Sequence, residues 1–309
     1  MTLNSKSNCA LLAACRLPCL TLAAGVLLSA CGGGGGSSGS AIAANQAPVA
    51  TAKLIGEAVL NATTLFDTTG TADPDGSIAS RSWAYGDGQT GSADSHTYTA
   101  TGGYSAVLTV TDNSGASTST TLPVTVAKCS SAGTQDAKRS PFTTVCVQTS
   151  RGEMVFELYT TLAPVTTANF LRYVDEGFYR NTLFHRVIAD FVIQGGGYGA
   201  GPVVKAATHP AIPLESNNTL KNVQYTLAMA RLDTPPDSAT SQFFINLLGN
   251  PFLNYDPAKT TPNGYAVFGQ VISGTAVVDT IGAVVTATTA GLANVPVQDV
   301  LIQSIVRMP

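Results

Sequence analysis

The 309-residue chain has little charge and few of the residues that bind metals. Charged side chains make up 11% of it, and it has three histidines and six cysteines. No basic run stands out, so it lacks the charge pattern of a protein that binds nucleic acid. The cysteines and histidines show no CxxC or HxxxH spacing, so we expect neither a metal nor a cofactor. Low charge with abundant Thr, Ala and Gly favours an exported, β-rich protein of two or three domains.

Residues 1–30 have the pattern of an export signal. Lys6 and Arg16 provide positive charge, and residues 17–30 are uncharged and mostly apolar but too short to span a bilayer as a helix. The segment runs into Leu-Ser-Ala-Cys, which resembles a bacterial lipobox, and this resemblance implies that Cys31 is lipidated and becomes the mature N-terminus. An uncleaved anchor, or an ordinary signal with a chance cysteine, is the alternative.

Residues 31–45 form a Gly/Ser-rich tether that has almost nothing to bury. Gly32, not Asp, follows Cys31, which by resemblance to enterobacterial lipoproteins permits transfer to the outer membrane. We therefore expect a lipoprotein of the bacterial cell envelope, held to the outer membrane by its lipid and facing the periplasm or the surface.

Residues 46–127 alternate short β-type runs with turn signals, a pattern that predicts an immunoglobulin-like β-sandwich. The run YSAVLTVT, residues 104–111, puts every second side chain on one apolar face. The stretches DPDGSI, SWAYGDG, HTY and VLTVTDNSG resemble a PKD domain. Such domains serve exported bacterial proteins as spacers or adhesive modules, so a surface ligand of this domain is one candidate partner.

Four aspartates of this domain allow two interpretations. A calcium site is one, but each acid sits beside Gly, Pro or Asn, which favours turn capping; the four are Asp73, Asp75, Asp87 and Asp112. We interpret His96 and Trp83 as core or edge residues, not ligands.

Residues 128–140 are interpreted as a second linker. It carries Cys129, and Cys146 follows at the start of the next domain. If Cys31 is lipidated, these are the two cysteines left after the signal, and an oxidising compartment favours a disulfide between them. Two unrelated thiols are the alternative.

The most informative stretch of the last domain, residues 141–309, is FHRVIADFVIQGGG at residues 184–197. It predicts two strands with a cation, Arg186, beside an apolar lining and three glycines that permit close backbone approach. Further strands are expected near 145–149, 154–158, 225–230, 241–246, 264–271 and 300–306, with helices from Pro164 to Gly177 and near 275–281.

This domain resembles the cyclophilin-type peptidyl-prolyl isomerases in four ordered segments. They are APVTTANF, FHRVIADFVIQGGG, TLAMAR with SATSQFFIN, and GYAVFGQV. The resemblance implies a closed eight-stranded antiparallel β-barrel with two helices, so the whole chain is expected to be mainly β. It also implies an enzyme that accelerates rotation about X–Pro bonds in proline-containing polypeptides.

Rotation about X–Pro is slow because amide resonance gives the C–N bond double-bond character. A permanently charged donor aimed at the proline nitrogen favours the twisted state, and the resemblance assigns this role to Arg186. By resemblance, Gln194 and Gln242 orient it and the substrate. The residues expected to bind substrate are Phe191, Val192, Arg231 through its backbone, Phe244, Phe252, Leu253 and Tyr265. A structural salt bridge is the alternative for Arg186, and His185 is interpreted as a packing residue because the reaction moves no proton.

Three residues depart from the best-studied members of this family. Val192 replaces Met, Phe252 replaces Trp and Tyr265 replaces His. Loss of the indole donor is expected to weaken cyclosporin binding more than activity. A catalytically weak module that binds proline peptides, presented by an adhesive PKD domain, is the alternative function.

Overall fold

The computed structural model describes residues 44–261 and 263–309. The predicted signal peptide 1–30, the lipidation site Cys31 and nearly all of the tether lie outside the described residues. No helix among the described residues is both long enough and apolar enough to cross a membrane.

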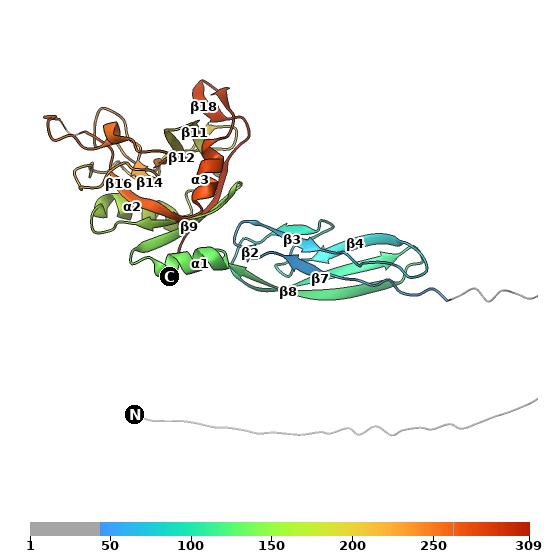
Figure 1. Cartoon of the computed structure of the whole chain (residues 1–309). Helices are drawn as coiled ribbons and strands as arrows, with labels where there is room; N and C mark the ends of the chain where they lie inside the picture. The colour runs from blue at the N-terminus through green and yellow to red at the C-terminus, as the bar shows by residue number, and fades with distance from the viewer. Residues whose placement is uncertain (1–43, 262) are drawn as a thin grey trace, which may run out of the picture. The chain divides into compact units, whose positions relative to one another are not determined.

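The first domain is a β-sandwich, as the sequence predicts (Figure 1). One sheet has the order β1-β3-β6 and the other β2-β8-β7-β4-β5, in which only β2 and β8 run parallel. The strands are β1 (Lys53–Ile55), β2 (Ala58–Val59), β3 (Thr63–Asp67), β4 (Ile78–Ala84), β5 (Thr90–Gly91), β6 (Ser95–Thr97), β7 (Gly102–Asp112) and β8 (Ser117–Ala127).

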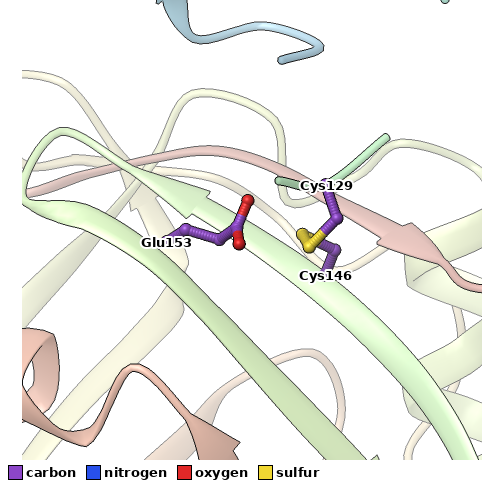
Figure 2. Close-up of side chains that lie close together, drawn as sticks. All are labelled: Cys129, Cys146 and Glu153. Carbon is purple, nitrogen blue, oxygen red and sulfur yellow. A yellow bond between two sulfur atoms is a disulfide. The ribbon is translucent and has the colours of Figure 1, made fainter. Parts of the chain in front are cut away.

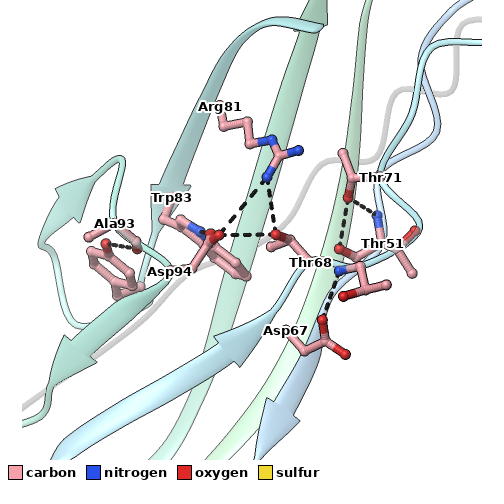
Figure 3. Close-up of polar contacts among 10 residues, drawn as sticks. Thr51, Asp67, Thr68, Thr71, Arg81, Trp83, Ala93 and Asp94 are labelled. Atoms are coloured by element: carbon pink, nitrogen blue, oxygen red, sulfur yellow. Dashed lines mark hydrogen bonds and ion pairs between the residues drawn. The ribbon is translucent and has the colours of Figure 1, made fainter.

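Every second side chain of β7 faces the core of the sandwich. Ala106, Leu108 and Val110 are fully buried, and Trp83 of β4 packs with them. Figure 3 shows how polar bonds join the two sheets at this point: from β4, Trp83 Nε1 donates to Asp94 Oδ1 beside β6 at 2.9 Å, and Arg81 Nη1 donates to Thr68 Oγ1 beside β3 at 3.1 Å. The two sheets are therefore held by hydrogen bonds as well as by apolar contact.

Three of the four aspartates accept backbone hydrogen bonds within turns, and the longest of these bonds runs from the amide of Asp75 to Asp73 Oδ1 at 3.5 Å. Asp112 Oδ1 accepts from the amides of Ser114 and Ala116, and Asp87 Oδ1 accepts from that of Gln89. The other oxygen of Asp87 lies 2.7 Å from Nε2 of His96. These bonds are those expected of aspartates that cap turns.

The second domain is a closed barrel of eight antiparallel strands, confirming the predicted architecture. The ring runs β11-β19-β9-β10-β16-β14-β15-β12, and pairing between β11 and β12 closes it. A two-residue strand, β13 (Val203–Val204), extends β12 at its outer side. The ring strands are β9 (Thr143–Thr149), β10 (Gly152–Leu158), β11 (Thr182–Ile188), β12 (Val192–Gly199), β14 (Thr226–Met229), β15 (Phe243–Asn246), β16 (Val267–Ser273) and β19 (Leu301–Arg307).

Two of the barrel's helices agree with the predicted ones. Helix α2 (Pro164–Asp175) begins with Pro at its first position and contributes Phe170 and Tyr173 to the core. Helix α3 (Thr275–Gly282) buries Val278 and Ile281. The remaining elements are the 3-10 turn η1 (Pro251–Leu253) and the hairpin of β17 (Thr286–Thr289) and β18 (Leu292–Pro296).

The segment 128–140 differs from the predicted linker, because it contains a third helix, α1 (Ser131–Arg139). The helix packs against β10, and Cys129, just before it, forms a disulfide with Cys146 of β9. Figure 2 shows Glu153 of β10 beside this disulfide. Its carboxylate accepts from the backbone amide of Ser130, the N-cap of α1, at 2.7 Å. The barrel thus holds the start of α1 by a covalent bond and a capping carboxylate.

Candidate active site

A row of side chains crosses four neighbouring strands on one face of the barrel. Register pairs Arg186 of β11 with Gln194 of β12, Gln194 with Phe244 of β15, and Phe244 with Ala228 of β14. Directly paired residues of adjacent strands project from the same face of a sheet. The sheet therefore brings together a guanidinium, an amide and an aromatic ring that are far apart in the sequence.

These residues line a cavity of about 250 Å³. Its lining consists of Arg186, Phe191, Val192, Gln194, Ala230, Arg231, Phe244, Leu253 and Tyr265. Eight of these nine were predicted from the sequence. Ala230 was missed, since a small apolar side chain carries no chemical signal of its own. Apolar walls with a few convergent polar groups are typical of a ligand-binding pocket.

Arg186 is half-buried at this cavity, with its guanidinium carbon 6.0 Å from the centre of the Phe191 ring. Its Nη1 donates to Gln194 Oε1 over a long 3.4 Å, and Gln194 Nε2 donates to Gln242 Oε1 at 2.9 Å. Among the described residues, no acid lies within ion-pair distance of Arg186, so a structural salt bridge does not account for it there. The guanidinium keeps donors for a ligand.

The glycines of the QGGG motif make room for this arrangement. Gly196 has φ +84°, and a Cβ there would lie 2.8 Å from the Tyr179 ring. A Cβ at Gly197 would lie 2.5 Å from the side-chain amide of Gln242. Larger residues would displace Gln242, so the motif permits the hydrogen-bonded pair of Gln194 and Gln242 beside Arg186.

Arg231 was predicted to bind substrate through its backbone, but its side chain also contributes to the pocket. Its guanidinium stacks on the Tyr265 ring, 4.8 Å from the centroid, and Nε donates to the carbonyl of Gly264 at 2.9 Å. The side chain therefore joins two sides of the pocket, a role that sequence spacing could not show.

Two other predicted residues lie beside the cavity. Gln242 lines an adjoining hollow with Arg231 and Thr240. Phe252 is 71% exposed and stacks on Phe191 with ring centroids 5.6 Å apart, so it forms a rim next to the pocket.

His185 is buried beside the site, as expected of a packing residue. It is 5% exposed, its ring lies 4.4 Å from that of Tyr198, and its Nδ1 has no hydrogen-bond partner among the described residues. Burial lowers the pKa of His185 from 6.5 to about 4, with the charge of Arg186 adding to the effect.

Comparison with known proteins agrees with this geometry. Residues 144–307 match the family model of the cyclophilin type peptidyl-prolyl cis-trans isomerases, and residues 45–126 match that of the PKD domain. The chain is 47% identical to peptidyl-prolyl cis-trans isomerase B of Escherichia coli over 161 residues, which are 52% of this chain and 97% of that protein. It is 50% identical over 163 residues to relatives from Streptomyces antibioticus and Acinetobacter baylyi, covering 96% and 84% of them and 52% and 53% of this chain.

Proposed function

Because the chain belongs to the cyclophilin-type peptidyl-prolyl cis-trans isomerases, we propose that it accelerates X–Pro rotation in exported or envelope proteins from a lipid-anchored position. The main support for the proposal is the guanidinium of Arg186, which has N–H donors available for a ligand and lies beside an apolar cavity that suits a proline ring.

The reaction needs neither a nucleophile nor a proton transfer. The barrier to rotation, about 18–20 kcal/mol, comes from amide resonance, which the twisted state lacks. A donor to the proline nitrogen is accepted only when that nitrogen has left resonance, so Arg186 stabilises the transition state and not the planar ground states. Its guanidinium remains charged at every working pH, which suits this task.

The other residues hold the substrate in reach of Arg186. Phe191, Val192, Phe244 and Leu253 enclose the proline ring with apolar surface. Gln194 and Gln242 fix the guanidinium and contact the substrate backbone. Arg231, Phe252 and Tyr265 bind the neighbouring peptide: Arg231 with its backbone, Tyr265 at the cavity and Phe252 at the rim.

The location follows from the N-terminal sequence. Cys31, at the end of the lipobox-like segment, carries the lipid, and residues 31–45 let the folded domains stand off an outer membrane. The disulfide between Cys129 and Cys146 supports an oxidising compartment outside the cytoplasm.

Isomerisation of short Ala-Pro peptides, followed by NMR exchange, tests the catalytic proposal. The chain from Gln46 onward is compared with its Arg186→Ala variant. Loss of one preorganised donor is expected to lower kcat/KM by about 10²–10³-fold, while the melting temperature changes little because Arg186 lines an open cavity. Near-full activity in the variant would refute the mechanism. Peptide binding without turnover in either protein would favour a binding module instead.

A further inference from the structure

Three asparagines are buried behind the wall of the pocket. Asn222, Asn246 and Asn250 are 1%, 0% and 4% exposed. Burying an amide costs free energy unless its donors and acceptor are hydrogen-bonded. Asn246 even occupies a core position in β15, next to Ile245, where an apolar residue would pack without this demand. The three buried amides therefore need hydrogen-bond partners inside the protein.

Their side chains form a chain of hydrogen bonds that runs in one direction. Asn250 Nδ2 donates to Asn246 Oδ1 at 2.8 Å, and Asn246 Nδ2 donates to Asn222 Oδ1 at 3.2 Å. Asn222 Nδ2 in turn donates to Asn254 Oδ1 at 3.2 Å. None of these side-chain atoms is a buried polar atom without a partner. The network is rigid, because the amides of Asn222 and Asn246 both donate and accept and the amide group of Asn250 donates two bonds.

Two members of this asparagine network, Asn250 and Asn222, bond to the backbone of the pocket walls. Asn250 Nδ2 also donates to the carbonyl of Phe191 at 3.1 Å, and Asn222 Nδ2 donates to the carbonyl of Leu253 at 3.1 Å. Both of these residues line the cavity. The Leu253 carbonyl accepts in addition from the amide of Tyr265, a third lining residue, at 2.9 Å. Two walls that come from separate parts of the chain are thus tied together.

We propose that the asparagine network sets the width of the proline pocket by fixing Phe191 relative to Leu253. The inference rests on the proposed catalytic role of this pocket. Its members are positioning residues, since they contact the backbone of the walls and not the cavity. A pocket of fixed width holds the five-membered ring of proline and rejects a ring enlarged by one methylene, such as that of pipecolic acid.

The test compares Ala-Pro and Ala-pipecolyl peptides with the full-length protein and its Asn250→Ala variant. An extra methylene in a fitted apolar pocket costs about 10- to 200-fold in kcat/KM, which is the preference expected of the wild type. Asn250→Ala is expected to reduce this preference at least about threefold, with a lower kcat/KM for the prolyl peptide, because the pocket then adapts to the larger ring.

Thr149→Ala is the matched control. Thr149 is 5% exposed and makes two hydrogen bonds in the β9–β10 turn, to the carbonyl of Gly152 and from the amide of Arg151. Its loss should lower the melting temperature and leave the ratio of the two kcat/KM values unchanged. That contrast separates pocket width from general destabilisation.

An unchanged ratio in folded Asn250→Ala would overturn the inference while leaving the proposed function intact. Absence of turnover in the wild type would instead overturn the proposed function, and this inference with it. If Asn250→Ala does not fold, Asn254→Ala serves in its place, because Asn254 is partly exposed and its Oδ1 holds the amide of Asn222, which bonds to the Leu253 carbonyl. Its ratio should fall in the same direction, and an unchanged ratio would overturn the inference equally.

Discussion

The buried His185 makes a sharp prediction about stability in acid. Its pKa in the folded protein is about 4, against 6.5 for an unperturbed side chain. As the pH falls below 6.5, the unfolded chain therefore takes up the proton first, and protonation favours unfolding. Stability from this residue is fully present above pH 6.5 and is lost as the pH falls toward 4.

The magnitude follows from the two pKa values. They differ by about 2.5, and one pKa unit corresponds to about 1.36 kcal/mol, so the full loss is about 3 kcal/mol. About 2 kcal/mol of it is lost by pH 5, where the unfolded histidine is almost wholly protonated and the folded one is not. This is a large part of the total stability of a typical domain.

Urea unfolding at pH values from 9 to 4 measures the contribution of His185 to the free energy of unfolding. The chain from Gln46 onward is compared with its His185→Gln variant. The variant cannot titrate at this position, so the free-energy difference between the two proteins should shift by about 3 kcal/mol between pH 7 and pH 4. Between pH 7 and pH 9 the difference should stay constant, which serves as the internal control. Parallel curves down to pH 4 would refute the claim that His185 is held neutral.

Two further predictions concern the cysteines. Cys31→Ser should move the protein from the membrane to the soluble fraction, because it removes the only lipid attachment site proposed here, and unchanged fractionation would reject the anchor. Replacing both Cys129 and Cys146 by Ser should lower the free energy of unfolding by about 3 kcal/mol, because the bridge closes a loop of 17 residues. Isomerase activity at low denaturant should persist, since the bridge joins α1 to β9 and not to the pocket; a parallel loss of activity in the folded double variant would contradict this.

The individual strands and helices of the barrel were predictable because their signals are local, whereas the closed barrel and the grouping of most pocket residues were predicted from the resemblance to the cyclophilins. Alternating apolar strands, Pro164 at a helix start and the QGGG motif each specify local geometry. Register then places Arg186, Gln194 and Phe244 on one face of the sheet.

Helix α1 could not be predicted in the same way. Its sequence, SAGTQDAKR, has no strong apolar stripe, and helix propensity alone rarely stabilises nine residues. Contacts from distant residues stabilise it instead: Glu153 at its N-cap, the disulfide before it, and Glu157, which accepts from Ser140 Oγ at 2.8 Å at its C-cap. The asparagine network escaped prediction for the same reason, because its partners lie up to 59 residues apart in the sequence.

The closed barrel has a consequence for the proposed function, in which the pocket binds polypeptide chains whose X–Pro bonds are accessible. Such chains expose unpaired backbone donors and acceptors, which readily add to the edge of an open sheet and begin aggregation. In the described barrel, every ring strand has a partner on each side, because β11 and β12 close the ring beside Arg186 and Gln194. The strands that carry the pocket can therefore meet extended polypeptides repeatedly without being recruited into a growing sheet with them.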